Sequence, residues 1–197
     1  MINENQRQVF HILLGIAFIV LIYFEILTAF RIFVILILGV IVSLLSKKYK
    51  IPLVWQLLRK FERPSVIKKF PGKGTIFFFV GVLLVLRLFE KDIALASIII
   101  LTFGDSISHI IGMKFGRIKH PLNNNGKKKL EGSLAGLIAA FLGALIFVHP
   151  LLAFLGALAG MVAEALQLQL NNNEVDDNII VPLVAGTAML LARYFLL

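Results

Sequence analysis

The chain has 197 residues, 59% of them hydrophobic, and a mean hydropathy of +0.92. This composition excludes an ordinary soluble domain and predicts membrane-spanning helices, because helices satisfy their backbone polar groups internally. The absence of cysteine excludes disulfides, thiolate metal sites and a cysteine nucleophile. A net charge of +9 is typical of basic loops that orient a membrane protein, so we expect no nucleic-acid partner.

Seven apolar runs predict an all-α transmembrane bundle that forms one integral membrane domain over residues 1–197. The expected spans are Val9–Phe24, Leu27–Leu45, Thr75–Phe89, Ile93–Gly112, Gly132–Val148, Leu151–Leu170 and Ile179–Leu197. Residues 1–46 hold the first two spans, residues 47–74 form a basic loop, and residues 75–197 hold the other five spans.

Two loops carry most of the basic residues. The first loop contains Lys47, Lys48, Lys50, Arg59, Lys60, Arg63, Lys68, Lys69 and Lys73. The second loop contains Lys114, Arg117, Lys119, Lys127, Lys128 and Lys129. Basic loops face the cytoplasm, so we expect a cytoplasmic N-terminus and chemistry at the cytoplasmic face. Within the first loop, Ile51–Phe61 predicts an amphipathic helix at the membrane interface.

Two carboxylates lie inside expected spans. Asp105 shares a helical face with Thr102 and His109, and Glu164 follows two glycines at four-residue steps. A charge in hydrocarbon is costly, so each carboxylate is a functional candidate with an expected partner. The alternative is that both only pair with basic residues and hold the bundle together.

Three lysines stand before the fifth span, where Lys127 and Lys128 precede Glu131, Gly132 and Ser133. Lysines beside a helix N-terminus favour phosphate groups, because the free amides and the helix dipole attract anions. The alternative is that the lysines only anchor the helix at the membrane surface.

Two further polar segments lie on the same predicted face. Asp176, Asp177 and Asn178 precede Pro182, and their clustered oxygen atoms suit Mg²⁺. The alternative is that Asn178 or Asp177 only caps the following helix. Lys73 lies between two glycines. This segment either binds phosphate or only forms a turn of the chain. The chain has no Walker A motif, which argues against a P-loop ATPase.

Taken together, these segments resemble a known family. They are Gly104–Ser106, Gly112, Phe115–Arg117, Lys127–Ser133, Glu164 and Asp177–Pro182. In combination they are similar to the dolichol kinase, phytol kinase and CTP-dependent diacylglycerol kinase family, which is similar in turn to the phosphatidate cytidylyltransferases. The resemblance runs from about Phe70 to the C-terminus.

The resemblance implies a CTP- and Mg²⁺-dependent transferase of the cell membrane, with residues 75–197 as its core and a lipid acceptor from the bilayer. It implies metal binding by Asp105 and Asp177, binding of the CTP phosphates by Lys127 and Lys128, and an orienting role for Glu131. The residues themselves add Glu164 as a metal ligand, Lys73, Gly132 and Ser133 as phosphate contacts, and His109 as a base, so the expected catalytic residues are Asp105, His109, Lys128 and Glu131.

Three functions stay open at this point. The preferred one is phosphorylation of a polyprenol- or dolichol-like isoprenoid alcohol, with a diacylglycerol-type acceptor as a close variant. The second is synthesis of a CDP-lipid, but the chain lacks the Pro-Gly-His-Gly-Gly segment and the Asp-Arg pair of the cytidylyltransferases. The third is a small transporter. The sequence leaves the oligomeric state open.

Overall fold

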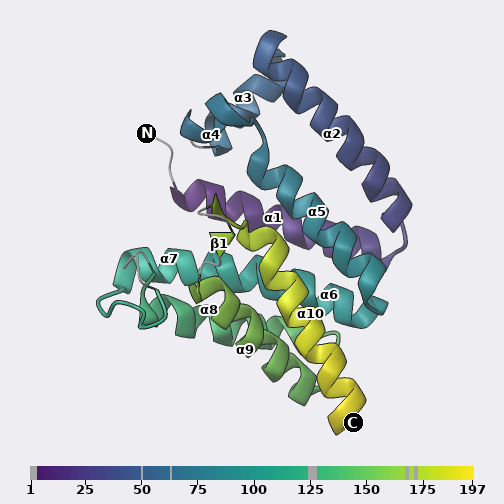
Figure 1. The fold of residues 1–197 in the computed structure, drawn as a ribbon, viewed down its shortest axis with the longest axis vertical. Coiled ribbons are helices and arrows are strands. Elements are labelled where there is room, and N and C mark those ends of the chain that lie inside the picture. Colours follow the sequence, from purple (N-terminus) through teal and green to yellow (C-terminus); the bar gives the residue numbers. More distant parts are fainter. Residues whose placement is uncertain (1–3, 50, 63, 124–127, 167–168, 171–172) are drawn as a thin grey trace.

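The computed structural model describes residues 4–49, 51–62, 64–123, 128–166, 169–170 and 173–197, which form a helical assembly (Figure 1). The helices are α1 (Glu4–Tyr23), α2 (Ala29–Tyr49), α3 (Pro52–Phe61), α4 (Pro64–Lys69), α5 (Lys73–Leu88), α6 (Lys91–Ile99), α7 (Ser106–Phe115), α8 (Leu130–Ala144), α9 (Pro150–Leu166) and α10 (Asp177–Leu196). A π-helical turn, η1 (Ile100–Asp105), joins α6 to α7. Two short strands, β1 (Gln169–Leu170) and β2 (Asn173–Glu174), pair antiparallel. The expected helical class is confirmed.

Within the described residues, four helical segments are long and apolar enough to cross a membrane: Glu4–Tyr23, Ala29–Ser46, Lys91–Phe115 and Asp177–Leu196. The other three expected spans are shorter apolar helices, α5, α8 and α9, of 16, 15 and 17 residues. The seven apolar helices are therefore present, whereas seven crossings and their orientation stay a prediction.

Two of the expected spans end earlier in the structure than the sequence predicts. Helix α8 ends at Ala144 instead of Val148, and the following residues form turns before Pro150. Proline lacks the amide hydrogen that a helix interior needs, so it starts α9 at a position where that hydrogen has no helical partner. Helix α9 ends at Leu166 instead of Leu170, because the chain then enters the short hairpin.

The segment α6–η1 is the centre of the assembly. All seven residues from Ile93 to Ile99 are buried, and η1 contacts α1, α8, α9 and α10. Helix α10 crosses this region, and α2 lies at the outer edge (Figure 1). A π-turn accommodates an extra residue within a helix, and such turns are common at functional sites. Here the π-turn ends at Asp105.

Small residues allow the helices around this centre to approach closely. A Cβ atom on Gly15 of α1 would lie 2.2 Å from the Thr102 hydroxyl, and one on Gly160 of α9 would lie 2.9 Å from Ile100. Thr102 is fully buried and donates to the carbonyl of Ile98 at 2.7 Å. The side chain of Thr102 therefore occupies the space that a side chain on Gly15 would need, and α1 packs directly against η1.

Helix α3 is the amphipathic helix expected between the first and third spans. It begins at Pro52 and ends at Phe61, close to the predicted bounds, and α4 follows it. We refer to α3 and α4, residues 52–69, as the interfacial arm. The arm contacts α1 and lies beside the start of α5 (Figure 1).

Gly132→Ala is expected to destabilise the bundle. A Cβ atom at this position would lie 2.4 Å from the backbone oxygen of Ser108, so α8 and α7 would have to separate. Overpacking of this kind costs about 1–3 kcal/mol. The measurement is thermal unfolding of the purified variant in detergent.

The matched control is Gly39→Ala on α2, where a new Cβ meets no atom within 4 Å. This change is expected to leave stability unchanged or slightly higher, because alanine is the better helix former. Equal melting temperatures for the two variants would contradict the close packing of α7 and α8.

Candidate active site

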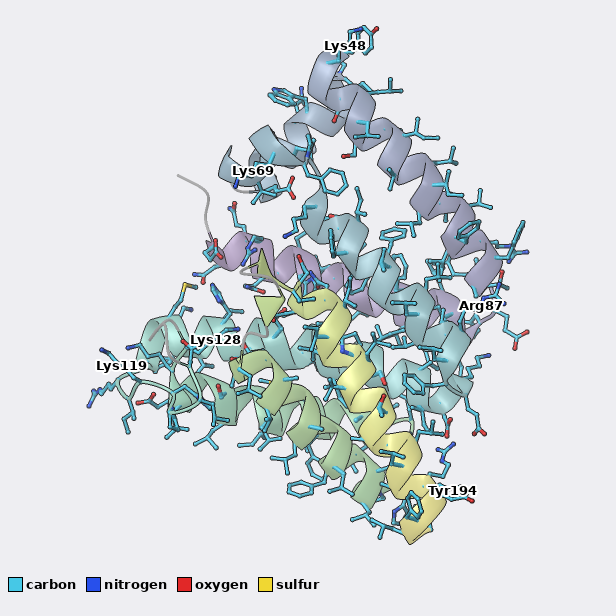
Figure 2. All side chains as sticks on the ribbon, in the orientation of Figure 1. Lys48, Lys69, Arg87, Lys119, Lys128 and Tyr194 are labelled. Atoms are coloured by element: carbon cyan, nitrogen blue, oxygen red, sulfur yellow. The ribbon has the colours of Figure 1, made fainter. Side chains whose placement is uncertain are left out.

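A cavity of about 580 Å³ lies where the beginnings of α5 and α10 meet α1, η1 and α7. Its charged and titratable lining residues include Lys73, Asp105, His109, Lys128, Asp176 and Asp177. Lys128 lies within the molecule beside these elements, whereas Lys119 extends outward from the loop before α8 (Figure 2). The structure therefore brings together five of the predicted site residues, Lys73, Asp105, His109, Lys128 and Asp177, from four separate parts of the chain.

Lys128 is the electrostatic centre of the cavity. Its ammonium group pairs with Oε1 of Glu164 and lies 3.7 Å from Oδ2 of Asp177. Glu164 is fully buried and accepts a hydrogen bond of 3.3 Å from the Ser108 hydroxyl. Its other oxygen, Oε2, is buried and has no hydrogen-bond partner among the described residues. Glu164 thus has the basic partner expected for an intramembrane carboxylate.

The surroundings of Lys128 favour its protonated form. Burial lowers the pKa of Lys128, but the negative charges of Asp105, Glu164 and Asp177 outweigh burial and raise the pKa above its usual value. Three carboxylates thus act on a single buried ammonium group. The arrangement therefore has more carboxylate oxygens than this one ammonium group occupies, and these can bind a further cation.

Asp176 caps α10 in place of the two expected candidates. Its Oδ1 accepts hydrogen bonds from the backbone and side-chain nitrogens of Asn178, at 3.3 and 2.7 Å. Its Oδ2 lies 3.7 Å from the ammonium group of Lys73. Because Asp176 satisfies the helix start, Asp177 remains available to face Lys128.

The turn that carries Lys73 is held from two sides. Oε2 of Glu62 accepts from the backbone nitrogen of Gly72 at 2.5 Å, and Oε1 accepts from that of Gly74 at 3.4 Å. The hydroxyl of Ser43 on α2 donates to the backbone carbonyl of Pro71. The next residue, Gly72, has a φ of +76°. Burial raises the pKa of Glu62, although these backbone amides act in the opposite direction. Glu62 and Ser43 had no place in the sequence-based site, because neither belongs to a recognisable motif.

Helix α1 also contributes to the cavity, through Arg7 and His11. Oε1 of Glu4 lies 2.6 Å from Nη2 of Arg7 and 3.3 Å from Nε2 of His109, which links α1 to α7. Sequence reasoning assigned no role to this helix. The available signal was the spacing of Arg7 and His11, which places both on one face at the polar end of an apolar helix.

Four predicted residues do not line the cavity: Glu164, which is fully buried behind Lys128, and Glu131, Gly132 and Ser133. Oε1 of Glu131 accepts from the backbone nitrogens of Arg117 and Ile118 at 2.9 and 3.0 Å, so Glu131 holds the loop after α7. Gly132 packs against α7, and Ser133 is buried. Their roles in catalysis and nucleotide binding stay predictions. The predicted nucleotide ligand Lys127 lies outside the described residues.

The carboxylates fit a metal ion that arrives with a phosphate ligand. In the part of the chain that the structure describes, no three His, Asp or Glu side chains form a metal site by themselves. Mg²⁺ prefers oxygen ligands and commonly takes one or two carboxylates together with substrate phosphates. Asp105 and Asp177 line the cavity and supply oxygen donors of this kind, whereas the unpaired oxygen of Glu164 is buried outside the lining, so its role as a metal ligand stays a prediction.

Lys128→Met is expected to destabilise the protein strongly, because it leaves Glu164 buried without its cation. Breaking a buried pair in this way costs about 3–5 kcal/mol. The double variant Lys128→Met/Glu164→Gln removes both charges and is expected to recover much of that loss. Thermal unfolding of the single and double variants in detergent measures the coupling. Additive effects of the two substitutions would contradict the ion pair.

The chain is similar to several known proteins. No family model matches it, and no solved structure matches it. An uncharacterized protein of Methanocaldococcus jannaschii is 30% identical over 187 residues, which cover 93% of this chain and 91% of the relative. CTP-dependent diacylglycerol kinase 1 of Schizosaccharomyces pombe is 25% identical over 135 residues, 60% of this chain and 59% of that protein.

Phytol kinase 1, chloroplastic, of Arabidopsis thaliana is 32% identical over 136 residues, 62% of this chain and 43% of that protein. The chain thus spans about half the length of the named kinases that it matches. Its apolar helices and these homologues together indicate an integral membrane protein. The chain belongs to the family of the Methanocaldococcus jannaschii protein, and its similarity to a CTP-dependent diacylglycerol kinase and to phytol kinases supports a lipid kinase at family level.

Proposed function

We propose that this protein transfers the γ-phosphoryl group of CTP to the hydroxyl group of a membrane lipid alcohol, with Mg²⁺ bound to the nucleotide. The observation that carries the proposal is the cavity lined by Lys128, Asp105 and Asp177, in which Lys128 is also paired with the buried Glu164. The homologous kinases support CTP as the donor and a lipid as the acceptor.

Phosphoryl transfer asks the protein mainly for positioning and charge neutralisation. Lys128 and Lys73 are placed to donate to phosphate oxygens, in a cavity where a buried cation acts strongly on developing charge. Asp105 and Asp177 would hold Mg²⁺, which on binding neutralises phosphate charge. Glu164 keeps Lys128 protonated and in place.

The acceptor hydroxyl needs a group that removes its proton. Asp105 and His109 both line the cavity and are the candidates for this role. The lipid oxygen forms a bond to the γ-phosphorus, the bond from that phosphorus to the β-phosphate bridging oxygen breaks, and CDP leaves. The lipid proton passes to the base. We propose an isoprenoid alcohol as the acceptor, polyprenol- or dolichol-like or shorter, with diacylglycerol as the alternative.

The reaction takes place at the cytoplasmic face, where CTP is found. Two features support this orientation: the basic residues of the loops between α2 and α5 and between α7 and α8, and the interfacial arm beside the cavity. We place the protein in the cell membrane, with residues 75–197 as the core of the transferase.

Asp105→Asn is expected to lower kcat by about 100- to 1,000-fold, the usual effect of losing one group that stabilises charge in the transition state. The measurement is lipid phosphorylation at saturating CTP by purified, folded protein. The control is Asp92→Asn on α6, because Asp92 pairs with Arg193 and does not line the cavity. Full activity of the Asp105 variant would remove Asp105 from the mechanism.

The function itself is tested with CTP labelled at either the α- or the γ-phosphate, in detergent with Mg²⁺, lipid alcohols and phosphatidate. Transfer of the γ-label to lipid with release of CDP is the expected result. Transfer of the α-label with release of pyrophosphate would instead identify a cytidylyltransferase. Transfer of neither label by folded protein would contradict a lipid transferase.

A further inference from the structure

The cavity has an apolar side that the transfer chemistry does not use. This side is formed by Phe10 and Leu14 of α1, Leu58 of α3, Val66 of α4 and Phe78 of α5. Most of the charged residues come instead from η1, α7, the loop before α8 and the start of α10, together with Lys73, and Arg7 and Glu62 border the apolar side. A single cavity therefore has a charged wall and an apolar wall.

The apolar wall has a rigid base and partly exposed sides. Phe78 is fully buried, and its ring meets the rings of His11 and Phe18 edge to face, each at 5.3 Å between centroids. Phe10 and Leu14 are only partly buried. An apolar ligand that covers apolar surface in a cavity removes this surface from water, which favours binding. Ligand sites commonly combine such surface with a few polar groups.

The interfacial arm supplies the other half of this wall. Leu58 and Val66 are also partly buried and line the cavity from α3 and α4. Leu58 lies over the turn before α5, since a Cβ atom on Gly72 would be 3.7 Å from its Cδ2 atom. An amphipathic helix lies at the level of the lipid headgroups. The arm therefore borders the cavity at the depth where the hydroxyl of a lipid alcohol resides.

We propose that Phe10, Leu14, Leu58 and Val66 bind the hydrocarbon of the acceptor lipid next to its hydroxyl group. This inference rests on the proposed function for the identity of the ligand. The cavity, at about 580 Å³, is of the size of a small-molecule site, about 300–1,000 Å³, so it encloses only the first part of a long chain. The wall selects acceptors by the shape of the segment beside the hydroxyl, and the rest of the chain stays in the bilayer.

The first test places larger side chains on the apolar wall, so that the cavity becomes narrower. Leu58→Phe and Val66→Phe are expected to raise KM for the lipid alcohol about tenfold, the scale of discrimination by one or a few methylene groups, and to leave KM for CTP unchanged. The matched control is Leu134→Phe on α8, at a side chain that is 52% exposed and does not line the cavity. Wild-type KM for the lipid in both arm variants would overturn the proposal.

The second test needs no turnover, so it separates this site from the proposed reaction. The only tryptophan of the chain is Trp55, one helical turn before Leu58. A brominated isoprenoid alcohol, titrated without nucleotide, is expected to quench Trp55 fluorescence saturably in the wild type and in the Leu134 variant. The quenching curve is expected to shift to higher concentration in the Val66 variant.

The two tests have distinguishable failures. Saturable quenching with the expected shift, but no labelled lipid from CTP, would contradict the kinase and keep the lipid site. Lipid phosphorylation together with unshifted, non-saturating quenching in every variant would keep the kinase and place the acceptor elsewhere. Quenching by a brominated diacylglycerol, with none by the isoprenoid alcohol, would overturn the isoprenoid acceptor and leave the wall as the site of a glycerolipid.

Discussion

The ion pair between Lys128 and Glu164 fixes the geometry on which the rest of the site depends. Glu164 is fully buried in α9, and Lys128 precedes α8, so the pair joins segments that are 36 residues apart. A buried carboxylate is costly without a cation, and the cation in turn draws Asp177 at the start of α10 toward it. The position of one lysine thus determines how three helices meet.

Close helix packing makes this arrangement possible. Lipid provides little hydrophobic driving force between helices, so association depends on small residues that let backbones approach. Gly132 brings α8 against α7, and Gly160 brings α9 against η1. The π-turn ends at Asp105, which then lines the cavity together with Lys128. The same packing that stabilises the bundle therefore positions its charged groups.

Part of the site was readable from the sequence, because charge inside an apolar run is unusual and loop parity places such charges on one face. Asp105 was predicted from its place in an apolar run, and Lys128 and Asp177 from polar loops on the same predicted face. The structure places all three around one cavity. The cap by Asp176 and the contact of Glu62 with Gly72 were missed. The cap depends on which of two neighbouring carboxylates reaches a backbone amide. The Glu62 contact joins two separate elements, and the periodicity of a sequence does not encode such contacts.

The short helices α8 and α9 give the molecule a narrow apolar belt on one side. At about 1.5 Å per residue, the 15 residues of α8 span about 22 Å, whereas a bilayer core is about 30 Å thick. Hydrophobic mismatch of this kind is relieved by local thinning of the bilayer. If α8 and α9 cross the membrane, as the sequence predicts, the lipids around them are compressed, and bilayer thickness becomes a variable that acts on how this protein sits and works in its membrane.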